Sequence, residues 1–276
     1  MIRAAIKLFL LVVWIGVFYP FAYGAYKLRK LQWRDWLVKV CFQGILRICE
    51  IRLHLVSHLS PVRPLLLVSN HLSYMDIPIL GSQAVLSFTP KMDIATWPFI
   101  GSVCSIMDCV FVERSADKIA DAREAMRRAL ANNRVLSLFP EATTGNGLEV
   151  LPFRSSLFSL AEELIEGREL TVQPVAITYK TIRRLPIDRT QWPSIAWYGD
   201  MELLPHLWEF LQLGCIDVEL AFLPAVTLHA HGDRKALAVH TQNAIVQHIE
   251  QSRKNKIPAT QNMLLSALAY WFRSKS

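Results

Sequence analysis

From residue 51 onward, short β-rich runs alternate with patterns typical of helices. The β-rich runs are Ile51–Val56, Pro64–Ser69, Ala84–Phe88, Cys109–Val112, Arg134–Phe139, Thr171–Thr178 and Ile216–Leu223. The helical patterns begin near Ser115 and cover Ser155–Glu166 and Arg234–Arg253. Such alternation is typical of an α/β fold, and no Pro/Gly-rich linker divides the segment. We therefore predict one α/β domain over residues 51–276, with a mixed β-sheet flanked by helices.

The first fifty residues precede this domain and form a separate, strongly apolar segment. The run Leu8–Tyr26 contains no charged residue and is about nineteen residues long, close to the length that crosses a bilayer. A secretory signal is the alternative, but no clear small-residue cleavage site follows, while Pro20 would interrupt a long helix. We therefore predict a membrane anchor within residues 1–50, as either a spanning helix or a monotopic one.

The charges around the apolar run predict which side of the membrane the domain occupies. Four basic residues between positions 27 and 34 follow the run, whereas Arg3 and Lys7 precede it. The heavier flank predicts a domain on the cytoplasmic side of the inner membrane. A net charge of +7 would suit nucleic acid or an anionic membrane. The anchor favours the membrane, and we predict no nucleic-acid partner.

The segment Gln32–Glu50 carries polar residues at three- to four-residue intervals and is otherwise almost entirely apolar. This pattern predicts a helix with a narrow polar stripe. Its broad apolar face, which includes Trp33 and Trp36, could lie in the membrane interface or cover the core of the domain. The stretch Met263–Phe272 raises the same question near the end of the chain.

The cysteines and histidines exclude several classes of site. Five cysteines are scattered without a CxxC pair, and eight histidines are dispersed along the chain. This usage argues against a disulfide framework and a metal site, and it fits a reducing cytoplasm. The chain also lacks a Gly-x-Ser-x-Gly elbow, which argues against a serine hydrolase with an acyl-enzyme intermediate.

His71 and Asp76 follow the buried run Pro64–Ser69 directly. Histidine transfers protons near neutral pH, and a carboxylate can orient its ring and raise its basicity. Residues five apart on a regular helix point about 140° from each other, so the pair can meet only across a loop or a helix start. Taken alone, the two residues fit better a hydrogen-bonded histidine at a strand end and an aspartate that caps the next helix.

The loop Pro140–Gly147 follows a second buried run and adds to the case for a site. It offers the carboxylate of Glu141, the hydroxyls of Thr143 and Thr144, and the exposed backbone of two glycines. Such groups could bind a polyol or an anionic headgroup, although a glycine-rich turn with an exposed glutamate is the alternative. Ligands gather beyond the carboxyl ends of strands in open α/β sheets, so this loop and His71 could border one cleft.

Lys91 and Arg114 are the candidate cations of this cleft, since each follows a β-rich run. A lone cation at a strand end is usually a solvated charge. Arginine's planar fork makes Arg114 the better candidate to bind a phosphate.

Four blocks, in this order, resemble the motifs of the glycerolipid acyltransferases, the 1-acylglycerol-3-phosphate acyltransferase family. They are Asn70-His71-x-Ser73-x-x-Asp76, Cys109 to Arg114, Phe139 to Thr144, and Val172 to Val175. The resemblance covers roughly residues 60–180. It implies a donor that is acyl-CoA or acyl carrier protein, a membrane lysolipid as acceptor, and direct transfer to the acceptor's hydroxyl, with no further cofactor.

The resemblance also implies roles for individual residues. His71 would remove the hydroxyl proton, and Asp76 would orient the imidazole. Lys91, Arg114 and Glu141, with Thr143 and Thr144, would bind the headgroup of the acceptor.

The third block departs from the family pattern, which usually reads Glu-Gly-Thr-Arg where this chain has Glu141 to Thr144. One charge-assisted contact to a phosphate is therefore missing. Lysophosphatidic acid remains the first expected acceptor, with lyso-ornithine lipid, which lacks a phosphate, close behind. The alternatives are a lipid hydrolase that uses His71 to activate water, and a lipid-binding protein that has lost the chemistry. Cys109 also stands where glycine is common, with no consequence that the sequence assigns.

Overall fold

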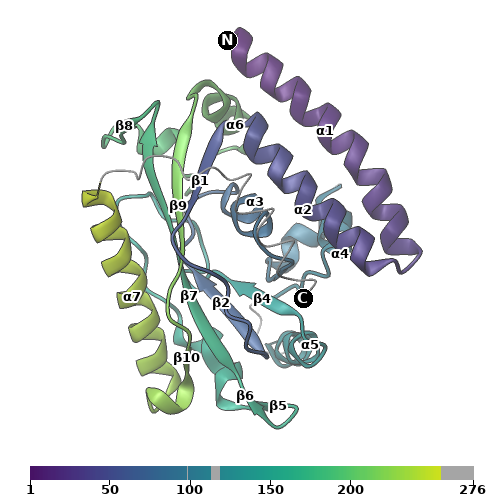
Figure 1. Ribbon diagram of the computed structural model, residues 1–276, viewed down its shortest axis with the longest axis vertical. Coiled ribbons are helices and arrows are strands. Elements are labelled where there is room, and N and C mark those ends of the chain that lie inside the picture. Colours follow the sequence, from purple (N-terminus) through teal and green to yellow (C-terminus); the bar gives the residue numbers. More distant parts are fainter. Residues whose placement is uncertain (98, 113–118, 256–276) are drawn as a thin grey trace, which may run out of the picture.

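The computed structural model describes residues 1–97, 99–112 and 119–255, and its centre is an eight-stranded sheet (Figure 1). The main path through the sheet is β1, β9, β7, β2, β4, β3. In that order the strands are Ile51–Leu55, Ile216–Phe222, Thr171–Ile182, Leu65–Ser69, Val135–Leu138 and Ser87–Phe88. β7 runs parallel to β2 and antiparallel to β9, so the sheet is mixed, as predicted. The short strands β8 (Leu185–Pro186) and β10 (Val226–Thr227) also pair with β7.

Helices cover both faces of the sheet (Figure 1). The first face carries α1 (Ile2–Lys27), α2 (Leu31–Ile48), α3 (Asp76–Gly81) and α6 (Leu203–Gln212). The second face carries α5 (Ile119–Ala131) and α7 (Arg234–Lys254). Alternate side chains of a strand point to opposite faces, so Leu65 and Leu67 join the first core and Leu66 and Val68 the second. Burial on both sides explains why β2 is apolar throughout.

Most predicted strands are confirmed, and the differences lie at the edge of the sheet. β7 runs past its predicted end to Ile182. The run Ala84–Phe88 contributes only the two residues of β3. The run Cys109–Val112 is not a strand: Val110 N donates to Phe88 O of β3 at 2.9 Å, and beyond β3 a single bridge pairs Val112 with Lys91.

The predicted helices show one clear error. Ser155–Glu166 is not an α-helix but a 3₁₀-helix over Ser155–Glu162, after which Gly167 at φ +73° turns the chain into the hairpin of β5 (Leu164–Ile165) and β6 (Arg168–Glu169). The helices α5 and α7 confirm their predictions, although the predicted start of α5 at Ser115 lies outside the described residues.

The prediction gave no bounds for three short helices and missed several 3₁₀ turns. The helices are α3, whose start at Asp76 the sequence did indicate, α6 and α4 (Ile100–Ile106), none longer than ten residues. The 3₁₀ turns are Met92–Thr96, Trp192–Ser194 and Leu228–Ala230. Elements of this length show too few turns for a helical period to stand out in a sequence.

The N-terminal helix α1 lies along the domain rather than leading away from it (Figure 1). Its mean hydropathy reaches 2.0, and it is long and apolar enough to cross a membrane. Near its start Lys7 pairs with Glu50 at 3.3 Å, and near its end the Tyr19 hydroxyl lies 2.9 Å from that of Ser102. Pro20 lies inside the helix without interrupting it, contrary to expectation, because buried residues lie on both sides of it: Leu11 before it and Ala22 after it.

The second helix, α2, buries one part of its apolar face in the domain and exposes another part. Phe42 and Leu46 of α2 are buried in the first core, so the helix covers the domain. Trp33 and Trp36 are exposed, at 65% and 56%, so its first turns leave a large apolar surface uncovered. The division into segments 1–50 and 51–276 stays a prediction, and Met263–Phe272 lies outside the described residues.

Candidate active site

The turn that follows β2 brings His71 and Asp76 together. Asn70 ends the strand, and its side-chain amide donates to Ile177 O at 3.0 Å and accepts from Ile177 N at 2.9 Å. The chain then makes an irregular turn, and α3 begins at Asp76. His71 Nδ1 lies 2.9 Å from Asp76 Oδ2. The two residues therefore meet across a turn that ends where a helix starts, consistent with the loop or helix start that the spacing required.

The carboxylate of Asp76 is fully buried, and four donors surround it. Oδ2 accepts from the backbone N–H of Leu72 at 2.7 Å and of Ser73 at 2.9 Å, in addition to His71. Oδ1 accepts from the hydroxyl of Tyr179 on β7 at 2.8 Å. A carboxylate that accepts this many bonds is ionised, so His71 Nδ1 carries a proton toward it. The other ring nitrogen, Nε2, is then the one that can take up a proton.

The ring of His71 is held from one side and reachable from another. It stacks on Phe139 with ring centroids 3.9 Å apart and an angle of 13° between the planes. Its side chain remains 18% exposed, while that of Asp76 is not exposed at all. Among the described residues, none hydrogen-bonds Nε2. The geometry therefore offers a proton acceptor at the protein surface with its orientation fixed from behind.

Glu141 joins the loop after β4 to the histidine turn. Its Oε1 accepts from the backbone N–H of His71 at 2.7 Å, and its Oε2 accepts from that of Leu151 at 2.8 Å. The residue is only 4% exposed, and burial raises the pKa of its carboxyl to about 7 despite these two bonds. Both oxygens thus hold main chain in place, and the predicted headgroup contact of Glu141 stays a prediction.

The rest of the loop is fixed by residues distant in the sequence. Gly145 N donates to His71 O at 2.8 Å, which ties the loop to the turn a second time. Gly147 adopts φ +84°, and a Cβ there would lie 2.2 Å from the ring of Trp192. Arg253 of α7 lies over that ring, 4.9 Å from its centroid, and donates to Gly147 O at 2.8 Å.

The remaining predicted site residues lie at the same edge of the sheet. Thr143 is exposed and Thr144 half-buried, and both follow Glu141 in the loop. Lys91 is exposed and follows β3, whose Phe88 stacks on Phe139 at 6.5 Å. Arg114 lies outside the described residues. The described part of the predicted set therefore gathers at the carboxyl ends of β2, β3 and β4, as the strand-end argument predicted.

Sequence reasoning missed Tyr179, Trp192 and Arg253. Tyr179 lies in β7, a strand whose residues are all buried, and burial raises its pKa well above the ordinary value, so its hydroxyl stays protonated and donates. A buried tyrosine needs a hydrogen-bond partner, and this was the available signal. Trp192 and Arg253 gave no comparable signal, because their link to the loop exists only in three dimensions.

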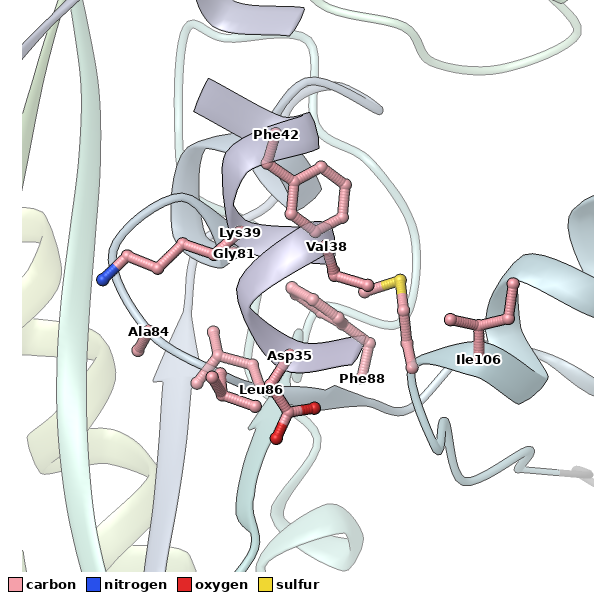
Figure 2. A pocket seen from close by; sticks show the side chains of 11 residues that line it. Asp35, Val38, Lys39, Phe42, Gly81, Ala84, Leu86, Phe88 and Ile106 are labelled. Atoms are coloured by element: carbon pink, nitrogen blue, oxygen red, sulfur yellow. The ribbon is translucent and has the colours of Figure 1, made fainter. Parts of the chain in front are cut away.

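A small cavity lies between α2, α3 and α4, and Phe88 forms part of its wall (Figure 2). Its walls are mostly apolar, with Asp35 and Lys39 on α2 as the polar members. Gly81 contributes to the wall, and a Cβ there would lie 2.5 Å from the ring of Phe42, so only glycine lets α3 approach α2 this closely. Its volume is about 10 Å³, room for no more than a water molecule.

Residues 50–178 match the family model described as Acyltransferase. The chain is 37% identical to a lyso-ornithine lipid O-acyltransferase of Brucella abortus (strain 2308), over 82% of this chain and 86% of that protein. The chain belongs to the acyltransferase family. Acyltransferases act with an acyl donor, and this one acts on a lipid substrate, as the resemblance implied.

Two further relatives are named for two different acceptors. A lyso-ornithine lipid O-acyltransferase of Rhizobium meliloti (strain 1021) is 34% identical over 74% of this chain and 72% of its own length. A 1-acyl-sn-glycerol-3-phosphate acyltransferase of Neisseria meningitidis serogroup B is 29% identical over 74% of this chain and 76% of its own length. The expected acceptors are the substrates named for these two kinds of relative, and the comparisons favour neither.

The fold of this acyltransferase is also that of a solved structure. The 1-acyl-sn-glycerophosphate acyltransferase PlsC from Thermotoga maritima superimposes with a TM-score of 0.65, over 92% of this chain and 98% of that one. The two sequences are 18% identical, so the likeness concerns the fold alone. It confirms the predicted mixed α/β sheet with flanking helices.

Proposed function

We propose that this acyltransferase moves a fatty acyl group from a thioester to the free hydroxyl of a lysolipid, with His71 as general base. The observation that carries the proposal is the 2.9 Å bond between His71 Nδ1 and the buried carboxylate of Asp76. It leaves Nε2 as the nitrogen that accepts a proton, on a ring that solvent and substrate can reach. No acyl-enzyme nucleophile is needed, because the acceptor supplies the attacking oxygen.

The reaction follows from that geometry. Nε2 removes the proton from the acceptor hydroxyl as its oxygen attacks the carbonyl carbon of the thioester. The carbon–sulfur bond then breaks, and the proton on Nε2 passes to the departing thiolate. Asp76 stays ionised throughout and stabilises the imidazolium that forms between the two steps. The products are the diacylated lipid and the free thiol of acyl-CoA or of acyl carrier protein.

The loop 140–147 positions this machinery and lies where a headgroup would enter. Glu141 holds the backbone of His71, and we assign it a positioning role. Thr143 and Thr144 present hydroxyls beside it, and Lys91 supplies a cation at the neighbouring strand end. Arg114 lies outside the described residues, and its role at the headgroup is proposed from the resemblance alone.

Thr144 supports lyso-ornithine lipid as the better of the two acceptors. The family pattern has an arginine at this position, which would bind a phosphate, whereas this acyltransferase has the uncharged hydroxyl of Thr144. An arginine forms two parallel charge-assisted bonds to a phosphate, whereas a threonine forms one neutral bond. An acceptor without a phosphate loses nothing by this exchange.

The contacts of α1 support a monotopic anchor. Both of its ends bind the same domain, so a helix that crossed the bilayer would have to give up one set of contacts. We propose that α1 lies along the cytoplasmic leaflet of the inner membrane, with the exposed Trp33 and Trp36 of α2 in the interface.

An acceptor panel tests the function. Purified protein is given a radiolabelled acyl donor with lyso-ornithine lipid, with lysophosphatidic acid, or with no acceptor. We expect acylated product with a lysolipid and better use of the ornithine lipid. Transfer to neither acceptor would refute the proposal, and free fatty acid in place of acylated lipid would identify a hydrolase.

The variant Thr144→Arg tests the headgroup argument in the same panel. We expect it to improve the use of lysophosphatidic acid relative to lyso-ornithine lipid, because it restores a charge-assisted contact. Thr143→Arg is the matched control, since it places the same charge on the exposed neighbour. An unchanged ratio in Thr144→Arg, or an equal change in both variants, counts against a specific role for position 144.

A further inference from the structure

Four arginines gather at the end of the sheet where β7 turns into β8, away from the histidine turn. Arg183 and Arg184 form the turn, at φ +52° and +69°. Arg3 and Arg183 both reach Gly214, where they lie 3.5 and 3.1 Å from the position of a Cβ. Arg52 comes from β1, which is separated from β7 by β9 in the sheet. We call these four residues the arginine cluster.

Three of the four arginines also lie near Cys215, the residue that follows Gly214. Burial raises the pKa of the Cys215 thiol, the positive charges of Arg52 and Arg184 lower it, and the negative charges of Asp217 and Glu50 raise it. Arg183 N also donates to Cys215 O at 2.7 Å. The four guanidinium groups therefore belong to one site, although they come from three separate segments of the chain.

The positive charge of the cluster is only partly neutralised. Arg3 pairs with Glu50, and Asp217 binds His54 and Thr181 instead. Arg183 donates to the carbonyls of Gln212 and Leu213 at the end of α6. Arg52 and Arg184 are exposed, and neither has an ion pair with any residue in the described part of the chain.

Exposed aliphatic side chains flank these cations. Ile2 precedes Arg3 and is 80% exposed, and Leu185 follows Arg184 and is 69% exposed. The apolar surface of α1 continues from Ile2, and Figure 1 shows β8, α6 and the start of α1 at the same end of the molecule. Guanidinium groups beside exposed aliphatic chains match the boundary between headgroups and acyl chains in a membrane.

We propose that the arginine cluster binds the phosphate headgroups of anionic membrane phospholipids and so sets how the domain sits on the bilayer. Arginine suits this task, since its planar fork makes two bonds to one phosphate. A basic residue near an anionic leaflet adds about five-fold to membrane partition. The role concerns bulk lipid and not the acceptor, so it holds whichever lysolipid is acylated.

Vesicle flotation of the full chain tests the proposal without turnover. Partition is compared between vesicles of phosphatidylcholine alone and vesicles that also contain phosphatidylglycerol. We expect the anionic lipid to increase partition, and the increase to shrink by about five-fold in Arg52→Ser or Arg184→Ser and further in the double variant. Added salt should weaken the increase, because exposed charges are screened.

The matched control is Arg168→Ser, which removes an exposed arginine from the β5–β6 hairpin at the other end of the molecule (Figure 1). It should partition like the unchanged protein. Thermal melting and acyl transfer in detergent micelles show that each variant is folded.

Equal lipid dependence in the double variant and the unchanged protein would overturn the proposal. So would a variant that keeps its response to phosphatidylglycerol but loses affinity for acyl carrier protein, since the cluster would then bind an acidic donor protein. Failure of the acceptor panel leaves these outcomes unchanged, so the two proposals can fail separately.

Discussion

The two loops that build the site are held in different ways. In the turn 70–76, three of the four donors to Asp76 come from within five residues of it. In the loop 140–147, the fixing groups come from elsewhere: the backbone of His71, the ring of Trp192 and the guanidinium of Arg253. The turn carries its own geometry, whereas the loop takes its geometry from the finished fold. Substitutions in the turn should therefore act on chemistry, and substitutions in the loop should act on stability as well.

The largest expected effect is that of His71→Ala. Loss of the general base should lower kcat by about 10²- to 10⁴-fold and leave the fold intact, because the ring is partly exposed and its Nε2 supports no other group. Initial rates of acyl transfer and a thermal melt measure the two quantities. His240→Ala, which removes an exposed histidine of α7, is the control. Near-normal turnover without His71 would show that another group takes the proton.

Glu141→Gln should reduce both stability and activity. An amide can accept from only one of the two backbone N–H groups that Glu141 binds, so one buried donor loses its partner. Such a loss costs about 1–3 kcal/mol. Denaturant unfolding measures it, and kcat should fall together with it because the His71 backbone moves. A variant as stable as the unchanged protein would mean that the two bonds do not fix the loop.

The same substitution gives a prediction for pH. The pKa of Glu141 is about 7 in the folded protein against 4.5 without its surroundings, so the native carboxyl holds its proton longer than the unfolded one. Glu141 therefore lowers the free energy of unfolding as pH rises from about 4.5 to above 7, by up to about 3 kcal/mol. Melting curves at pH 5 and pH 8 should show a smaller loss in Glu141→Gln. An equal loss in both proteins would contradict the burial of this carboxyl.

Tyr179→Phe tests how far the turn is self-sufficient. The change removes one of four donors to Asp76 and keeps the ring, so kcat should fall by only about 2- to 12-fold, the value of one hydrogen bond. KM for the acceptor should change less than kcat, because Tyr179 contacts Asp76 behind the imidazole. A purely structural role would alter stability without lowering kcat.

Ala142→Gly should have the smallest effect, and it should stabilise the protein rather than destabilise it. Ala142 adopts φ +59°, a conformation that strains residues with a Cβ, and the family pattern has glycine there. Relief of this strain should stabilise the protein by up to about 1 kcal/mol, after the entropy that glycine adds to the unfolded chain. Chemical denaturation measures it. A destabilised variant would show that the alanine methyl group contributes packing that outweighs the strain.

The difference between the two loops also explains what the sequence could predict. His71, Asp76 and the helix start between them follow from local spacing, and the strands β2 and β4 follow from continuous apolar runs. The pairing of the two loops followed from the strand-end rule. The internal bonds of Glu141 did not, since a glutamate in a glycine-rich loop reads as exposed, and only the fold reveals that both oxygens face main chain.

The edge of the sheet was harder to predict than its centre. Central strands are buried on two sides and need apolar residues throughout, whereas β3 is only two residues long and the run 109–112 beside it makes few bonds. The 3₁₀-helix at Ser155–Glu162 escaped for another reason: its apolar spacing resembles that of an α-helix, and the fold decides between the two.

The paired bonds between Asn70 and Ile177 fix the position of the active site relative to the sheet. The side-chain amide of Asn70 imitates a peptide group, so it adds one more pair of hydrogen bonds to those between β2 and β7. The histidine is the next residue, and its position is therefore counted from the register of the whole strand. A single residue inserted into β2 would move His71 by about 3.3 Å and turn it to the other face of the sheet, even if every contact within the turn survived.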